Sequence, residues 1–163
     1  MSTDTIDQTG ACFCKKVKYQ IKGEVMGNSN CHCRACSIAH GSPFVHYLIV
    51  KNEFFHVTAG EDSIKVYTNH GNLRVARCTD CGTPIYQTPE GATFKATFPR
   101  MYDSVDMSVK EPLYSKVGGG LNFMAPNAHW NYENRIMDVN DDLPKFAGFP
   151  PNGMVNNDGS PKA

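Results

Sequence analysis

The stretch that decides the fold of this chain places three thiols within six residues, Cys31-His32-Cys33-Arg34-Ala35-Cys36. Two thiol pairs flank it, Cys12-Phe13-Cys14 on the amino-terminal side and Cys78-Thr79-Asp80-Cys81 on the carboxyl-terminal side. These three groups contain all seven cysteines. Seven is odd, so disulfides cannot use every thiol, and a bridge across one or two residues strains the geometry that a disulfide needs. The grouping therefore predicts thiolates that converge on metal ions.

Zinc suits these ligands, because it takes thiolates readily and closes a structural site with four of them. Counting divides the seven cysteines into four and three. We predict that the two pairs form a closed tetrahedral site from Cys12, Cys14, Cys78 and Cys81. The triplet then supplies Cys31, Cys33 and Cys36 and leaves a fourth position open, as in catalytic zinc sites. Two zinc ions per chain are expected, one structural and one catalytic.

Spacing alone leaves alternatives open for both groups. The two pairs could be metal-free cysteines, buried or redox-active, although the stretch from Cys78 to Gly82 has the C-x-x-C-Gly form of a zinc-knuckle turn. The triplet could be a second closed structural site completed by a histidine or a carboxylate, or a redox-active thiol group. His32 lies inside the triplet, and the other five histidines lie elsewhere in the chain.

Composition argues against several classes of function. Sixteen Lys and Arg balance sixteen Asp and Glu over 163 residues, so no basic excess indicates a nucleic-acid partner. No stretch approaches the roughly 18 apolar residues of a membrane helix. The first ten residues lack the apolar core of a secretory signal. Clustered cysteines without such a signal are typical of a reducing compartment, so we expect a cytoplasmic protein with no membrane or nucleic-acid partner.

Hydrophobic patterning predicts an all-β fold. Residues 17–21 alternate apolar with polar side chains, which indicates a half-buried strand that ends at Gly23. A short helical turn is expected over 34–39. Further strands are predicted where aromatic and β-branched residues gather, at 44–50, 53–57, 64–68, 73–77 and 94–98.

These short strands, with few helical patterns between them, indicate one domain of short antiparallel strands over residues 9–149. The zinc pairs would staple segments of it that are distant in sequence. Residues 1–8 are expected to be frayed, because they are polar and terminal. Residues 150–163 are rich in Pro, Gly and Asn and are predicted to be a disordered tail.

The order of the cysteine motifs resembles the glutathione-dependent formaldehyde-activating enzyme family, which includes centromere protein V. Its pattern is G-x-C-x-C, then C-H-C-x-x-C, then C-x-x-C-G. The matching stretches here are Thr9-Gly10-Ala11-Cys12-Phe13-Cys14, Cys31-His32-Cys33-Arg34-Ala35-Cys36 and Arg77-Cys78-Thr79-Asp80-Cys81-Gly82-Thr83. A weaker similarity continues through His129-Trp130 and residues 141–146, so the resemblance covers residues 8–147.

The resemblance implies a β-tent fold with two zinc ions. It assigns the two pairs to the structural ion and Cys31, Cys33 and Cys36 to the catalytic one, which is the division that counting gives. It also implies a carbon–sulfur lyase that forms S-(hydroxymethyl)glutathione from glutathione and formaldehyde. A thiol would enter the open position, lose its proton and attack an aldehyde carbonyl.

Glutathione carries two carboxylates, so its site should offer cations. Lys15 follows the first cysteine pair, Arg34 lies within the triplet, and both are candidates for substrate binding together with His40. Either His32 or His40 could move the proton to the new hydroxyl. Trp130 could line the pocket, although ordinary core packing explains it as well.

A non-catalytic zinc module that binds a protein partner is the alternative function. A chaperone of small GTPases with a related fold would need only one four-cysteine site, so the triplet argues against it. Metal content separates these alternatives, since two zinc ions per chain favour the enzyme and one favours the module. The physiological thiol and aldehyde, and the oligomeric state, stay open.

Overall fold

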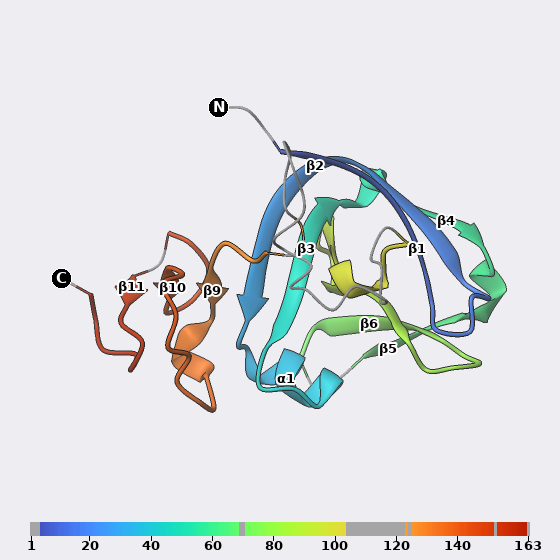
Figure 1. The fold of residues 1–163 in the computed structure, drawn as a ribbon. Coiled ribbons are helices and arrows are strands. Elements are labelled where there is room, and N and C mark those ends of the chain that lie inside the picture. Colours follow the sequence, from blue (N-terminus) through green and yellow to red (C-terminus); the bar gives the residue numbers. More distant parts are fainter. Residues whose placement is uncertain (1–3, 69–70, 104–122, 124, 152, 163) are drawn as a thin grey trace, which may run out of the picture. The chain divides into compact units, whose positions relative to one another are not determined.

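The computed structural model describes residues 4–68, 71–103, 123, 125–151 and 153–162 (Figure 1). Strands dominate the described residues, as the all-β prediction requires, and one short α-helix interrupts them. None of the described helices has the length and apolar character needed to cross a membrane. The elements are β1 (Thr5–Ala11), β2 (Lys18–Cys31), α1 (Arg34–His40), β3 (Val45–Lys51), η1 (Asn52–Phe54), β4 (Phe55–Ala59), η2 (Glu61–Ser63), β5 (Ile64–Thr68), β6 (Leu73–Cys78), β7 (Pro84–Pro89), β8 (Phe94–Thr97), η3 (Pro99–Met101), β9 (His129–Trp130), η5 (Tyr132–Asn134), β10 (Lys145–Phe146) and β11 (Met154–Val155).

The chain divides into two compact units. The first unit comprises Met1–Gly27 and Leu48–Ala125, and the second comprises Asn28–Tyr47 and Pro126–Ala163. Two strands, β2 and β3, begin in one unit and end in the other. Each cysteine group lies wholly within one unit.

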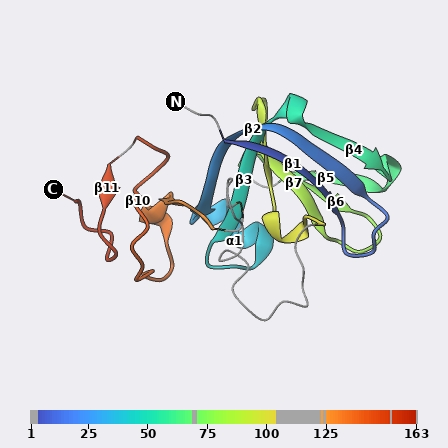
Figure 2. The same cartoon turned by 45° about the horizontal axis from the view of Figure 1, so that its top comes forward.

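All strand pairs of the first unit are antiparallel. Strands β5, β6, β7 and β8 pair in succession, β8 also pairs with β3, and the start of β2 pairs with both β1 and β4 (Figure 2). Strand β6 runs into the second cysteine pair, and β7 begins after it. The core of the first unit is a buried cluster of Ile6, Cys12, Val17, Tyr19, Ile21, Leu48, Val50, Phe55, Cys78, Ile85 and Tyr102.

Strand β9 organises the second unit. It pairs in parallel with the end of β2 on one side and with β10 on the other, and β10 pairs antiparallel with β11. Antiparallel strands were expected throughout, and the two parallel pairs differ from that expectation. A parallel partner needs a long connection, and more than ninety residues separate β2 from β9. Local patterning therefore carried no signal for this pairing.

Strand β2 is longer than predicted. Gly23 was expected to end it, but the strand continues to Cys31. A Cβ atom at Gly23 would lie 2.3 Å from the ring of Phe54. The glycine therefore lets the Phe54 ring pack closely against the strand, and it does not end the strand. The predicted helical turn is confirmed as α1, which begins at Arg34 and ends at His40, and Gly41 follows it in the left-handed conformation that favours glycine.

Both termini are more ordered than their composition suggests. Residues 5–8, predicted to be frayed, belong to β1 and pair with β2, while residues 1–3 lie outside the described residues. Within the predicted disordered tail, Met154–Val155 form β11. The Tyr132 hydroxyl donates a hydrogen bond to the carbonyl of Asn157 at 2.8 Å, which ties this segment to a buried side chain.

Candidate metal centres

The first cysteine pair lies in a tight turn after β1. The Cys12 amide donates to the Val17 carbonyl at 3.0 Å, and the Lys15 amide donates to the Cys12 carbonyl at 2.9 Å. Lys15 adopts a left-handed conformation with φ of 65°, which the turn requires. The Val17 amide also donates to the Cys12 sulfur at 3.2 Å. The turn thus presents the sulfur as a hydrogen-bond acceptor, which suits a thiolate.

A second turn delivers the other pair at the end of β6. The Cys78 amide donates to the Thr83 carbonyl and the Gly82 amide to the Cys78 carbonyl, both at 2.9 Å. Gly82 has φ of 72°, so the glycine of the predicted knuckle is needed for its backbone conformation. Hydrogen bonds that include one from the Thr83 hydroxyl overcome burial and lower the pKa of Cys81 to about 6.

The two turns bring four sulfurs together. The Sγ atoms of Cys12, Cys14, Cys78 and Cys81 all lie within 4.8 Å of one another. The Cys12–Cys14 and Cys14–Cys78 sulfur distances are 3.4 and 3.8 Å. Tetrahedral zinc with Zn–S bonds of about 2.3 Å separates its sulfurs by about 3.8 Å. The donor set and its spacing therefore fit a closed zinc site, as counting predicted.

The other three cysteines gather in the second unit, where β2 runs into α1. Cys31 ends β2, Cys33 precedes α1, and Cys36 lies in its first turn. The Cys33 sulfur accepts a hydrogen bond from the Cys36 amide at 3.2 Å and so caps the helix. The three sulfurs lie within 4.8 Å of one another, with 3.8 Å between Cys31 and Cys36 and 2.7 Å between Cys33 and Cys36. This group could also hold a metal ion, with three sulfur ligands.

His32 is directed away from the sulfurs that flank it in sequence. Side chains alternate between opposite sides of an extended chain, and the three-sulfur group does not include a His32 ring nitrogen. The His32 ring instead packs on Phe44, His129 and Tyr132, with centroid distances of 5.0, 5.0 and 4.9 Å. A closed four-ligand site completed by His32, one of the alternatives that spacing left open, is therefore not formed in this arrangement.

Two side chains contact the three-sulfur group from its surroundings. The Asn131 side-chain amide donates to the Cys31 sulfur at 3.4 Å. Burial, and next the Cys36 sulfur beside it, raise the pKa of the Tyr47 hydroxyl and keep it protonated. Within the group, hydrogen bonds from Cys31 and Cys36 lower the pKa of Cys33, while the pKa values of Cys31 and Cys36 are raised.

The predicted substrate-binding residues fall in different places. Arg34 is exposed at the start of α1, and His40 ends the same helix with its ring 6.2 Å from that of Tyr47. Lys15 lies in the first unit, beside the four-sulfur group, and forms an exposed ion pair with Asp103 at 3.9 Å. A groove of about 570 Å³ runs along α1 and is lined by Arg34, Ser37, Ile38, Gly41, Ser42, Pro43, Asn134 and Ile136.

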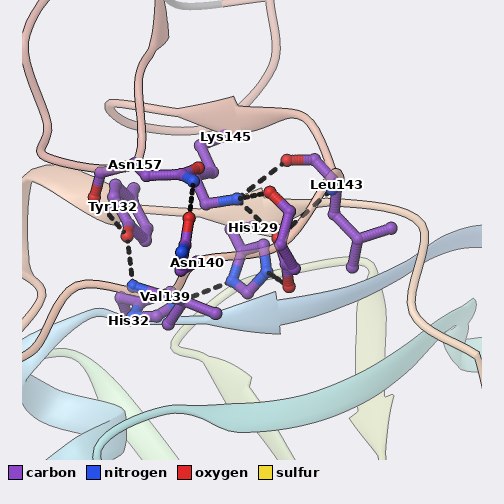
Figure 3. Close-up of polar contacts among 9 residues, drawn as sticks. His32, His129, Tyr132, Val139, Asn140, Leu143, Lys145 and Asn157 are labelled. Carbon is purple, nitrogen blue, oxygen red and sulfur yellow. Dashed lines mark hydrogen bonds and ion pairs between the residues drawn. The ribbon is translucent and has the colours of Figure 1, made fainter.

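The sequence proposes His32 as a proton carrier but does not indicate that it belongs to a buried polar chain behind the three-sulfur group. His32 Nε2 lies 2.8 Å from His129 Nδ1, and His129 Nε2 lies 2.9 Å from an Asp141 carboxylate oxygen (Figure 3). The buried Lys145 ammonium contacts the same carboxylate at 2.5 Å. The weak family similarity through residues 129–130 and 141–146 was the available signal, but it carried no role. Trp130 contacts Phe149, and Tyr132 is a fully buried core residue.

Together, the fold and the sulfur groups define a class: a β-sheet protein with two separate cysteine clusters, each able to hold a metal ion. The family model of the glutathione-dependent formaldehyde-activating enzyme matches residues 7–103. That match covers more than half of the chain, so the protein belongs to this family. The fold is also similar to the crystal structure of a Rhodobacter sphaeroides protein, a structural-genomics target, with a TM-score of 0.50 and 14% sequence identity over 61% of this chain and 92% of that one.

Proposed function

We propose that this protein is a zinc-dependent carbon–sulfur lyase that forms or cleaves a thiol–aldehyde adduct such as S-(hydroxymethyl)glutathione. The observation that carries the proposal is the separation of the seven cysteines into a group of four and a group of three. Four sulfurs complete a zinc site, whereas three leave one position for a ligand that is not protein. Membership of the formaldehyde-activating family supports a thiol as that ligand.

In the proposed reaction, the thiol sulfur bonds to the carbonyl carbon of formaldehyde, and the thiol proton ends on the former carbonyl oxygen. No oxidant or reductant is needed, and cleavage reverses the same steps. A zinc ion held by Cys31, Cys33 and Cys36 would supply a lower pKa for the incoming thiol. Asn131 holds the Cys31 sulfur in place by its hydrogen bond. The protonated Tyr47 hydroxyl offers a hydrogen bond beside Cys36.

Arg34 and the groove along α1 are the proposed binding site for the rest of the thiol substrate. Arg34 is a guanidinium one residue from Cys33, and carboxylates pair well with this fork of donors. The groove adjoins it on the same helix and is lined largely by small and apolar residues. His40, at the far end of α1, is proposed as a further contact for the substrate. Lys15 belongs to the first unit and is not part of this groove. Its contact with the substrate stays a prediction from the sequence.

The test follows adduct exchange by NMR in mixtures of zinc-loaded protein, glutathione and formaldehyde, above the rate without protein. Wild-type protein is expected to accelerate exchange, and Cys33→Ala to lose the acceleration while its NMR spectrum shows a retained fold. Arg34→Ala should weaken the dependence on glutathione concentration, and Arg100→Ala, an exposed arginine of the first unit, is its control. A folded Cys33→Ala variant as fast as wild type would refute the proposal.

Metal analysis of the same samples tests the non-catalytic alternative. The proposal requires two zinc ions per chain, with the ion of the three-sulfur group removed first by a chelator. One zinc ion per chain, with no acceleration of exchange, would instead favour a module that binds a protein partner. A cytoplasmic location belongs to the proposal too, because seven free thiols persist best in a reducing compartment.

A further inference from the structure

A continuous chain of hydrogen bonds leads from the buried Lys145 to His32 (Figure 3). It passes from the Lys145 ammonium to the Asp141 carboxylate, then through both ring nitrogens of His129 to Nε2 of His32. His32, His129 and Lys145 are buried, and all four residues belong to the second unit. The chain ends at His32, which lies between Cys31 and Cys33 in sequence but has its ring on the opposite side of the backbone from their sulfurs.

The lysine end of the chain fixes where negative charge lies. Lys145 Nζ has three acceptors, namely Asp141 Oδ1 at 2.5 Å and the carbonyls of Asp141 and Leu143 at 3.0 Å each. Three acceptors match the three donors of an ammonium group. The Leu143 amide also donates to Asp141 Oδ1, at 3.2 Å. Asp141 Oδ1 therefore faces two donors, and Oδ2 faces His129.

The direction of each hydrogen bond follows from this carboxylate. Oδ2 can only accept, so His129 carries a proton on Nε2. A neutral imidazole with a proton on one nitrogen has a lone pair on the other, so His129 Nδ1 accepts and His32 Nε2 donates. His32 then has its lone pair on Nδ1. Among the described residues, no side chain or backbone group forms a hydrogen bond with this buried nitrogen.

We propose that Asp141 is a positioning residue, which fixes the tautomer and ring orientation of His32 through His129 and leaves His32 Nδ1 as a buried hydrogen-bond acceptor behind the three-cysteine loop. This inference rests on the proposed function only for the assumption that this loop is the reactive one. Burial lowers the pKa of His129, which supports a neutral ring. The directed chain is how a carboxylate sets a histidine tautomer in known catalytic and metal sites.

An Asp141→Asn substitution should invert the whole chain. The amide nitrogen cannot occupy the Oδ1 position, because it would face the Lys145 ammonium and the Leu143 amide, which are both donors. It must take the Oδ2 position and donate to His129 Nε2. His129 then carries its proton on Nδ1 and donates to His32, whose proton moves to Nδ1. One substitution at a partly exposed residue thus converts His32 Nδ1 from a buried acceptor into a buried donor.

Long-range ¹⁵N–¹H NMR of the histidine rings tests the inference directly. In zinc-loaded wild-type protein near pH 7, His32 and His129 are both expected to carry the proton on Nε2. In Asp141→Asn both should carry it on Nδ1. Asp142→Asn removes an equal charge from the neighbouring exposed position and should leave both rings as in wild type. Nδ1 protonation of either ring in wild-type protein would overturn the proposal, even if the variant failed to fold.

Exchange measurements test whether the tautomer matters to the reaction. Residues that orient a reactive group from behind typically contribute about 10–100-fold, so Asp141→Asn should slow turnover by about tenfold or more with little change in KM. Asp142→Asn should match wild type. Inverted tautomers with unchanged turnover would overturn the positioning role. Wild-type protein that does not accelerate exchange would refute the proposed function and leave the tautomer result standing.

Discussion

Lys145→Met removes the ammonium at the start of the buried chain and should destabilise the second unit. The lysine side chain is 1% exposed, and its three hydrogen bonds end on two carbonyls and one carboxylate. Each carbonyl that loses its buried donor costs roughly 1 kcal/mol. The Asp141 side chain is 36% exposed, so water screens its charge. Losing the Lys145–Asp141 ion pair should therefore cost well below the roughly 3–5 kcal/mol of a broken pair that is fully buried. Methionine keeps most of the apolar stem, and we expect a total loss of about 2–4 kcal/mol.

Urea unfolding of the zinc-loaded protein, followed by fluorescence of its sole tryptophan, measures this loss within the same unit, because Trp130 lies on β9. Lys162→Met, at an exposed lysine of that unit, should change the free energy of unfolding by less than about 0.5 kcal/mol. Adding Asp141→Asn to Lys145→Met should cost less than the sum of the two, because no carboxylate is then left without its ammonium. A loss below about 1 kcal/mol for Lys145→Met, or strict additivity, would refute this account of the chain.

Three further predictions concern stability. Gly60→Ala places a Cβ atom 2.2 Å from a backbone carbonyl oxygen, whereas Gly91→Ala, at a similar positive φ, meets nothing within 4 Å. In urea, Gly60→Ala should lower the free energy of unfolding by clearly more than the roughly 1–2 kcal/mol expected of Gly91→Ala. Burial lowers the pKa of His129 below 6.5, so the unfolded chain binds the extra proton and the free energy of unfolding should fall as the pH drops below 6.5; His129→Gln should show a shallower decline over the same range. Tyr132→Phe removes the hydroxyl that bonds the Asn157 carbonyl, so limited proteolysis should cut residues 153–162 faster than in wild type, and equal rates would contradict the role of this contact.

The cysteine groups could be predicted because their chemistry is local. The second turn is specified within a few residues, by the glycine at position 82 and by the spacing of Cys78 and Cys81. Counting then separated four thiols from three without any knowledge of the fold. The same local reasoning correctly predicted α1, whose cap is the Cys33 sulfur itself.

The buried chain behind the second group could not be predicted in the same way. His32 and His129 are separated by 97 positions, and they meet because β9 pairs in parallel with the end of β2. Neither β9 nor β10 is longer than two residues, so hydrophobic periodicity cannot detect them. Lys145 is also buried against the usual preference of its residue type. Its burial depends on three acceptors that only the folded backbone supplies.

The two C-x-C motifs of this chain show how one spacing serves two purposes. In Cys12-Phe13-Cys14 the middle side chain is 88% exposed, because the motif lies in a surface turn and only its sulfurs are used. In Cys31-His32-Cys33 the middle side chain is fully buried and continues into the His129–Asp141–Lys145 chain. Alternation along an extended backbone places the sulfurs on one side and the imidazole on the other. A group of four sulfurs needs no such support, since its own ligands fix it. A group of three has one fewer constraint, and the buried histidine supplies an anchor for the loop from behind.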